Sequence, residues 1–493
     1  MVTIDATTRD RRESAGPLAA EYGLYVDGAW REPEAGRFDD RCPTTEAVVA
    51  AIPDASVAQM AGAVGAARRT FDGGAWSEAD PAFRASCLRQ LGEALVARRS
   101  EFVSLARVEW GCTENEDLLQ VDAPAYIALG AAELAATPAE EVQAGPAGQV
   151  LVRHEPVGVV SMITPWNFPH TINLMKVAPA LAAGNTLVLK PSPLAPLPAL
   201  ALARIVDEET DIPPGVVNVL STSSLEASQA LVTDPRVDMV SFTGSTAVGR
   251  TIMSAAGATV KKVVLELGGK SACIVLDGVD LDVLLPRLVF EGCSLHAGQA
   301  CILQSRLLVP DRLHDEVVGR LADLAGAVQV GDPLRPGVEM GPLISADQRR
   351  RVGELVDGAV AAGARVVAGG GPIERGRGHF FEPTVLTGVA PDAAIARTEV
   401  FGPVLTVLTY RDTDDAVRIA NDSPYGLSGA VHGPDDEAAV AVARRIRTGQ
   451  VAVNGAGAGG APFGGFKQSG IGREGGLVGM REYTETKAIG LPA

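Results

Sequence analysis

The spacing of apolar residues changes along the chain. Up to about residue 136 they recur mainly at helical intervals, which predicts helices over residues 57–71, 81–99 and 101–136. A hairpin at residues 24–30, with its turn at Asp27-Gly28, is expected before them. From residue 156 the apolar residues fall into short runs, which are typical of buried strands.

Those short runs alternate with helical patterns. Strands are predicted at 158–164, 186–190, 216–220 and 237–242, with helices at 173–183, 198–209, 226–232 and from about Ser245. This alternation is typical of βαβ units, which build a parallel sheet. We therefore interpret residues 156–265 as a doubly wound domain of the nucleotide-binding type.

The second half repeats the alternation and predicts a second α/β domain. Its expected strands are 272–276, 305–310, 404–410 and 450–454, and its expected helices are 311–328, 347–362 and 437–448. Residues 149–155 alternate like a strand after a Gly/Pro turn and are predicted to form a projecting arm. The glycine-rich stretch 455–476 is predicted to be a loop that lines a site.

Composition excludes several classes of protein. The chain has 493 residues, a net charge of −17 and no basic tract, which argues against nucleic-acid binding. No apolar run is long enough for a membrane span, and residues 1–17 lack the apolar core of a signal peptide. Residues 1–20 are expected to be a mobile tail. The six cysteines are scattered without metal-ligand spacing, so we expect a cytoplasmic protein with no metal site.

The segment 290–301, FEGCSLHAGQAC, carries the strongest candidate nucleophile. Gly298 permits a tight turn that brings Cys301 close to a ligand. A thiol attacks efficiently only when its thiolate is favoured or its proton is accepted. The alternative is a buried structural cysteine that packs as a small hydrophobic residue.

Two further motifs follow predicted strands. In FTGSTAVG, residues 242–249, Gly244 allows the turn and Ser245 caps a helix whose N-terminus can receive phosphate. It lacks the GxGxxG spacing, and Arg250 stands where a P-loop needs Lys, so an ordinary capped helix remains an alternative. In ELGGK, Glu266 ends a buried strand and is a candidate general base or a solvated strand end.

Three rigid turns complete the set of motifs. In PWNFP, two prolines hold Asn167, whose amide can stabilise an oxyanion. In KPS, Lys190 can meet ribose hydroxyls or phosphate, and EVFGP places Glu399 before another rigid turn.

In this order the motifs PWNFP, KPS, FTGSTAVG, ELGGK, GQAC, EVFGPV and PFGGFKQSGIGRE resemble the aldehyde dehydrogenase superfamily, from Leu24 to Lys487. The resemblance implies an α/β fold of two doubly wound parallel-sheet domains and a β-strand oligomerisation arm. The cofactor-binding domain would comprise 1–136 and 157–265, the catalytic domain 266–478, and the arm 137–156 and 479–493. A homodimer or homotetramer follows from such an arm.

The resemblance also implies a reaction, the oxidation of a small-molecule aldehyde to an acid with NAD or NADP, of which NAD is slightly favoured. The reaction would pass through a cysteine thiohemiacetal and a thioester. The catalytic residues would be Cys301, Glu266, Asn167, Lys176, which would support the oxyanion turn or the cysteine, and Glu474, which would relay protons. The cofactor would contact Ile163, Thr164, Pro165, Trp166, Lys190, Ser192, Phe242, Gly244, Ser245, Leu267, Gly268, Gln348, Glu399 and Phe401. Phe168 and Phe463 would line the aldehyde site.

Departures from the family pattern leave substrate and cofactor open. Pro193 stands where many NAD-preferring members have a Glu that would repel a 2′-phosphate, and His296 replaces the usual Asn. Met175 and Gly457 replace larger aromatics, which implies a roomier tunnel. The alternatives are a semialdehyde-specific member, a protein that binds cofactor without catalysis, and a thiol hydrolase using Cys301 and His296, which would not need the nucleotide-type domain.

Overall fold

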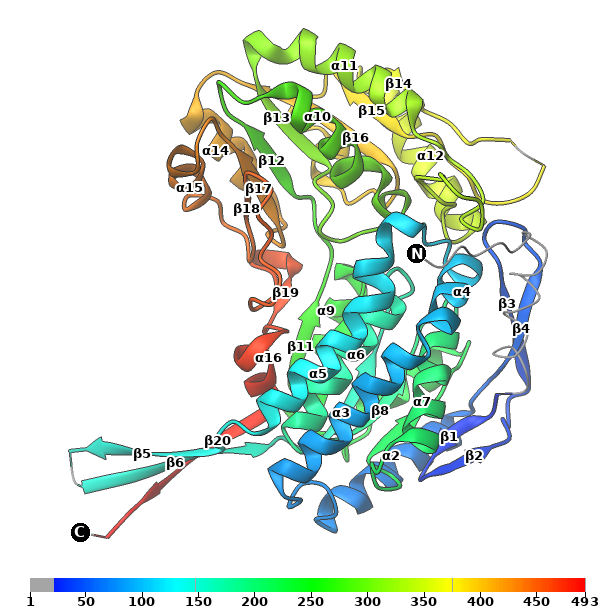
Figure 1. Cartoon of the computed structure of the whole chain (residues 1–493), viewed down its shortest axis with the longest axis vertical. Helices are drawn as coiled ribbons and strands as arrows, with labels where there is room; N and C mark the ends of the chain where they lie inside the picture. The colour runs from blue at the N-terminus through cyan, green and yellow to red at the C-terminus, as the bar shows by residue number, and fades with distance from the viewer. Residues whose placement is uncertain (1–21, 147, 375, 493) are drawn as a thin grey trace.

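Two sheets built mainly from parallel strands form the body of the protein (Figure 1). This computed structural model describes residues 22–492 apart from 147 and 375, so the tail predicted at residues 1–20 lies outside the described residues. The first sheet lies in the lower half of Figure 1 and the second in the upper half.

The first sheet confirms the doubly wound prediction. Its strands in spatial order are β19 (Gly470–Ile471), β11 (Lys262–Glu266), β10 (Met239–Thr243), β7 (Val159–Ile163), β8 (Thr186–Lys190), β9 (Val217–Val219), β1 (Leu24–Val26) and β2 (Ala29–Arg31). The strands from β11 to β9 are parallel, whereas β19, β1 and β2 pair antiparallel. The central strands are short apolar runs because both of their faces are covered.

Helices cover both faces of this sheet. They are α2 (Val57–Asp72), α3 (Pro81–Ala97), α4 (Arg99–Glu109), α5 (Ala123–Ala135), α6 (Pro169–Ala182), α7 (Leu197–Glu209), α8 (Leu225–Thr233) and α9 (Thr246–Ala256). Leu187 and Leu189 of β8 join a core with α3, α5, α6 and α7, while Val188 joins a core with α2 and α8. Alternate residues of one strand thus enter opposite layers, as the two-residue period requires.

The single helical stretch expected at residues 101–136 is wrong in one respect, because the structure divides it. Helix α4 ends at Glu109, and a 3₁₀ turn at Glu114–Glu116 and a π-helical turn at Leu118–Asp122 precede α5. Gly111 has φ +74°, and a Cβ there would lie 2.9 Å from the ring of Pro342. The close approach of Pro342 therefore fixes a break that only glycine accommodates easily.

The second sheet confirms the second α/β domain. Its order is β14 (Arg365–Ala368), β15 (Thr384–Thr387), β16 (Val404–Tyr410), β13 (Arg306–Pro310), β12 (Ala272–Val275), β17 (Gly429–His432) and β18 (Ala452–Val453), with β14 alone antiparallel. The helices between β11 and β19 are α10 (Leu281–Val289), α11 (His314–Ala327), α12 (Ala346–Ala361), α13 (Ala394–Arg397), α14 (Thr413–Asn421) and α15 (Asp436–Ala443). Helix α16 (Gly476–Glu482) follows β19 and packs against α5 and α6 of the first domain.

Two expectations in this half need correction. The helix expected at 437–448 ends at Ala443, where turns to Arg445 and Ile446 replace it. The stretch 455–476 is mostly loop, but it contributes β19, which pairs with β11 and so returns the chain to the first sheet. That return places the late Gly-rich motif beside the end of β11.

An antiparallel arm projects from the body, at the lower left of Figure 1. It consists of β5 (Glu140–Gly145), β6 (Gly148–Pro156) and β20 (Thr484–Gly490), with β6 in the centre. A separate hairpin, β3 (Arg37–Arg41) with β4 (Val48–Pro53), lies beside the first domain. Within the described part of the chain, no helix is both long and apolar enough to cross a membrane.

Candidate active site

Four parallel strands of the first sheet end at one edge. In register, Ile163 of β7 lies opposite Lys190 of β8, and Thr243 of β10 lies opposite Glu266 of β11. The turns that follow carry PWNFP, KPS, GSTAVG and LGGK. Ligands of open α/β sheets bind outside the carboxyl ends of the strands, and most of the predicted site residues meet there.

The segment 290–301, the cysteine loop, packs against this edge of the sheet and has an unusual backbone conformation. His296 and Ala297 have φ of +48° and +50°, and Gly298 has φ +74°. A Cβ at Gly298 would lie 2.0 Å from the carbonyl oxygen of Gly402, and a Cβ at Gly269 would lie 2.3 Å from that of Cys301. The loop therefore contacts both the LGGK turn and the turn that follows Glu399.

Asn167 lies directly beside the cysteine loop. It is buried, and its Nδ2 donates to the carbonyl oxygen of Gln299 at 2.9 Å. The side chain of Gln299 in turn donates to the carbonyl oxygen of His296 and accepts from the Ile344 amide. Asn167 and the loop thus form one connected unit, so that the amide and the nucleophile keep a fixed relation.

Cys301 differs from the other cysteines in exposure. Five of the six are buried, whereas Cys301 is partly exposed. Burial of the sulfur, and then the charges of Glu399 and Glu266, raise the pKa of the Cys301 thiol to about 12. In this state the thiol is protonated at neutral pH, so attack requires loss of that proton.

Glu266 is buried at the end of β11. Neither carboxylate oxygen has a hydrogen-bond partner among the described residues. Burial, followed by the charge of Glu474, raises the pKa of Glu266 well above its usual value. A Cβ at Gly464 would lie 2.9 Å from Oε1, so the glycine leaves room for this carboxyl group. Because its carboxylate oxygens lack hydrogen-bond partners and its pKa is raised, Glu266 is suited to accept a proton from a water molecule.

Lys176 and Glu474 form a buried ion pair behind Glu266. The Lys176 Nζ lies 2.5 Å from Glu474 Oε1 and donates to Ser241 Oγ at 3.1 Å. Ser241 in turn lies 3.1 Å from the Tyr483 hydroxyl. The structure therefore directs the Lys176 ammonium to Glu474 and Ser241, and it adds Ser241 and Tyr483, which were not predicted from the sequence, to the polar network.

The residues expected to hold a nicotinamide ribose cluster around Glu399. Its Oε1 accepts from the Gly269 amide at 2.9 Å, and a Cβ at Gly268 would lie 2.2 Å from Oε2. Gln348 Nε2 donates to the carbonyl oxygen of Phe401 at 2.6 Å, and the Phe401 ring meets Trp166 edge-on at 5.3 Å. Burial raises the pKa of Glu399 to about 7.

The start of α9 is open to a phosphate group. Ser245 caps the helix by accepting from the Val248 amide, and Gly244 donates to the carbonyl oxygen of Glu266. A Cβ at Gly244 would lie 2.4 Å from the ring of Phe242. Leu225 and Val248, which begin α8 and α9, are 73% and 47% exposed. These exposed apolar side chains, near a helix N-terminus that follows a glycine turn, fit the adenosine end of a dinucleotide.

The remaining predicted cofactor residues lie on the same turns. Burial lowers the pKa of Lys190 to about 8. The amide of Thr164 donates to the carbonyl oxygen of Lys190, and Ser192 Oγ accepts from the Leu194 amide. Ile163 and Pro165 flank Thr164, and the Leu267 amide donates to the carbonyl oxygen of Ser469. The polar side chains on these turns, and the glycines at which a Cβ would crowd its neighbours, fit a bound NAD(P).

Phe168 and Phe463 are the residues expected to line the aldehyde site. Phe168 packs against the cluster of Leu295, Ala300 and Leu303, and its ring lies 5.6 Å from that of His296. Phe463 pairs with Glu474 through two backbone hydrogen bonds. Met175 is partly buried, and Gly457 is exposed with no atom within 4 Å of a Cβ built there.

Sequence reasoning missed one further residue of this site, Glu116, which contacts His296 across 180 residues of chain. No local pattern signals such a contact. Among the described residues, no group of His, Cys, Asp and Glu side chains is arranged to hold a metal ion.

A partly exposed cysteine, a buried amide and a buried carboxyl group thus meet between two α/β sheets. The sequence model of the aldehyde dehydrogenase family matches residues 30–489. A 3-succinoylsemialdehyde-pyridine dehydrogenase from Pseudomonas sp. is 42% identical over 473 residues, which cover 94% of this chain and 98% of the relative.

Solved structures agree. Betaine aldehyde dehydrogenase from Staphylococcus aureus in complex with NAD+ superposes with a TM-score of 0.94 at 34% identity, covering 97% of each chain. A Mycobacterium tuberculosis aldehyde dehydrogenase complexed with NAD+ gives 0.93 at 40% identity, covering 96% of this chain and 99% of the other. The chain belongs to the aldehyde dehydrogenase family, and it is an enzyme that oxidises an aldehyde to a carboxylic acid with NAD(P)+.

Proposed function

We propose that Cys301 is the nucleophile of this oxidation. The partly exposed thiol first gives its proton to solvent. The thiolate then forms a C–S bond to the aldehyde carbon, and the carbonyl π electrons move to the oxygen. The Asn167 amide and the Cys301 backbone N–H stabilise that oxyanion. Bound NAD(P)+ supplies the acceptor for the hydride that leaves the carbon, after which Cys301 carries a thioester.

Glu266 completes the reaction in this proposal. It takes a proton from water, the resulting hydroxide attacks the thioester, and the C–S bond breaks to release the acid and the Cys301 thiolate. Glu474 and Lys176 pass the proton onward. The balance is one aldehyde, one water and one NAD(P)+ converted to one carboxylate, one NAD(P)H and two protons.

The observation that carries this proposal is the Asn167 bond to Gln299 beside Cys301, with the unpartnered Glu266 carboxyl group at the same strand edge. Nucleophile, oxyanion donor and base come from three distant segments. A protein that had lost catalysis would have no requirement to keep all three together.

We propose that Lys190, Ser192, Ser245, Gln348 and Glu399 hold the cofactor, with the adenosine end near Leu225 and Val248. Ile163, Thr164, Pro165, Trp166, Phe242, Gly244, Leu267, Gly268 and Phe401 form the surrounding walls. Because Pro193 removes the carboxylate that would repel a 2′-phosphate, both NAD and NADP are accepted, with NAD somewhat preferred.

The substrate is proposed to be a bulky small-molecule aldehyde that passes between Phe168 and Phe463. The Pseudomonas relative, which is named for a pyridine-bearing semialdehyde, supports this size. A panel of aldehydes of increasing bulk, assayed with each cofactor by NAD(P)H absorbance, tests it. Turnover of short aldehydes alone would contradict the proposal.

We further propose a cytoplasmic homodimer or homotetramer with the domain division 1–136 with 157–265, 266–478, and 137–156 with 479–493. The arm supports it, because β5 and β20 are both edge strands, and such edges need a partner. Light scattering that gave a monomer at micromolar concentration would contradict the assembly.

The test of the mechanism is Cys301→Ser. The variant is expected to lose aldehyde oxidation and to retain NAD(P) binding, measured by quenching of tryptophan fluorescence. Wild-type turnover by Cys301→Ser would rule the mechanism out.

A further inference from the structure

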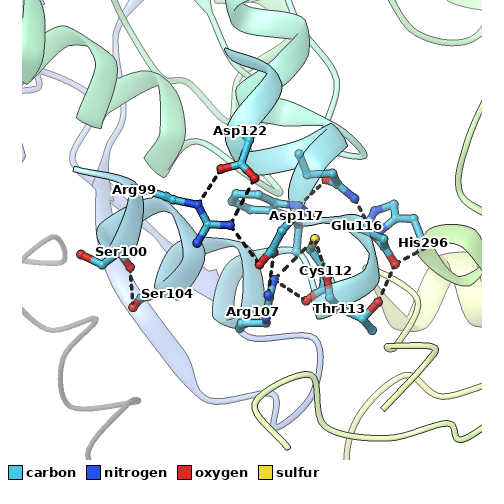
Figure 2. A network of polar contacts seen from close by, with 12 residues as sticks. Arg99, Ser100, Ser104, Arg107, Cys112, Thr113, Glu116, Asp117, Asp122 and His296 are labelled. Carbon is cyan, nitrogen blue, oxygen red and sulfur yellow. Dashed lines mark hydrogen bonds and ion pairs between the residues drawn. The ribbon is translucent and has the colours of Figure 1, made fainter. Parts of the chain in front are cut away.

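A buried carboxylate from the first domain reaches the cysteine loop (Figure 2). Glu116, at the end of the 3₁₀ turn Glu114–Glu116, is 0% exposed. Its Oε1 accepts from the backbone N–H of His296 at 3.1 Å, and its Oε2 lies 3.4 Å from His296 Nδ1. His296 itself is 1% exposed, so the contact is closed to solvent.

The Glu116 carboxylate is fixed from its own side as well. Thr113 Oγ1 donates to Oε1 at 3.0 Å, and Gln120 Nε2 donates to Oε2 at 2.7 Å. Gln120 Oε1 then accepts from the buried Trp110 Nε1 at 2.6 Å. Both carboxylate oxygens therefore accept hydrogen bonds from residues of the segment 113–120, which fixes the carboxylate before it reaches His296.

The cysteine loop needs such an anchor. Left-handed backbone at a residue other than glycine costs about 1–2 kcal/mol per residue, and both His296 and Ala297 adopt it. Strained backbone persists only where its surroundings over-determine it. Glu116 holds the loop at His296, and Gln299 holds it on the approach to Cys301.

The same carboxylate also lies beside the His296 ring. Nδ1 lies 3.4 Å from Glu116 Oε2 without a hydrogen bond, and the ring meets Phe168 at 5.6 Å with an interplanar angle of 64°. Phe168 follows Asn167 in the PWNFP turn. One carboxylate is therefore connected to the loop of the nucleophile through a backbone bond and to the oxyanion turn through an imidazole ring.

We infer that Glu116 is a positioning residue, which holds Cys301 and the Asn167 turn in register by accepting from the backbone N–H of His296 and packing against its ring. The inference rests on the proposed roles of Cys301 and Asn167. Glu116 touches neither reacting atom, and its effect is on the placement of the nucleophile.

The principal variant is Glu116→Gln, whose amide must turn its NH₂ group toward at least one of the donors. When a reacting group is misplaced by about 1 Å, the rate can fall on the order of 100-fold. We expect the rate of the first-turnover NAD(P)H burst, and the rate of Cys301 alkylation by iodoacetamide, to fall about 10-fold or more, with KM for NAD(P) unchanged.

The chain offers a matched control in the neighbouring residue. Asp117 is another carboxylate of the same segment, but its ion pairs go to Arg107 at 2.6 Å and Arg99 at 3.6 Å. Asp117→Asn therefore perturbs the segment without releasing the cysteine loop, and near-wild-type burst and alkylation are expected. If the burst and alkylation rates fell equally in Asp117→Asn and Glu116→Gln, the role of Glu116 would be structural only, and the inference would be overturned.

A second variant covers the case in which Glu116→Gln fails to fold. His296→Asn keeps the backbone N–H for Glu116 and tolerates left-handed backbone, but it removes the ring from Phe168. Alkylation is expected to stay within about twofold of wild type, while KM for the aldehyde rises; an unchanged KM would overturn the proposed role of the ring. The two proposals can fail separately. If Cys301 were not the nucleophile, Cys301→Ser would keep its turnover. If only the role of Glu116 were wrong, Cys301→Ser would still be inactive, and Glu116→Gln would be alkylated at the wild-type rate.

Discussion

The Lys176–Glu474 pair gives a prediction with a definite magnitude. Both side chains are almost wholly buried, at 0% and 2% exposure, and their charged atoms are 2.5 Å apart. Glu474→Gln leaves the ammonium group with one neutral amide and the Ser241 hydroxyl. Removing one partner of a buried ion pair costs about 3–5 kcal/mol, because the remaining charge is uncompensated.

That cost is large enough to measure in thermal unfolding. With a shift of about 2–4 °C per kcal/mol for a domain of 150–250 residues, Glu474→Gln is expected to lower Tm by at least ~6 °C. Lys176→Met is expected to lower it similarly. The double variant Lys176→Met/Glu474→Gln removes both charges and is expected to recover most of the loss.

The assay is differential scanning calorimetry of the four proteins without cofactor, at one protein concentration and one scan rate, since assembly and irreversible unfolding both affect Tm. Arg350→Ala, which breaks exposed pairs with Asp347 and Glu354, is the control and should change Tm little. A double variant whose loss equals the sum of the single losses would refute the reasoning.

The remaining predictions concern chemistry. Asn167→Ala should lower the burst rate by about 100- to 1000-fold, as for loss of one oxyanion donor, with cofactor KM unchanged; a loss below tenfold would contradict its role. Glu399→Gln removes a charge that raises the pKa of Cys301, so more thiolate is present at pH 8 and iodoacetamide labelling should accelerate; slower labelling would contradict this. Pro193→Glu should lower kcat/KM for NADP+ by about 10-fold relative to NAD+, since a repulsion of about 1.4 kcal/mol corresponds to that factor; an unchanged ratio would place the 2′-phosphate elsewhere. Glu474→Gln should lower the pKa of Glu266, because the Glu474 charge raises it; the ionised base is then present at lower pH, and the acid limb of the deacylation profile moves down in pH.

The strand framework could be predicted from the sequence because it depends on local pattern. The run TLVLK forms β8 with the same bounds as predicted. The apolar runs that precede Thr243 and Glu266 likewise lie at the ends of β10 and β11. Each strand is buried on both faces, so its apolar length marks its extent. The turn residues that follow were therefore placed at the correct edge of the sheet.

Features set by distant contacts could not be predicted. The break at Gly111 depends on Pro342, and the left-handed backbone of His296 is held by Glu116, 180 residues earlier. Likewise, the pairing of Lys176 with Glu474 joins residues 298 positions apart. Local propensity contains no information on such contacts, so the sequence singles out Cys301 as a candidate but not the residues that hold its loop.

Mass spectrometry of the Cys301 peptide from Glu266→Gln, quenched after one burst with aldehyde and NAD(P)+, identifies the residue that carries the acyl group. One equivalent of NAD(P)H and an acyl group bound to Cys301 are expected, because attack and hydride loss precede the step that needs Glu266. One equivalent of NAD(P)H with an unmodified Cys301, or an acyl group on another residue, would contradict the role of Cys301 as nucleophile.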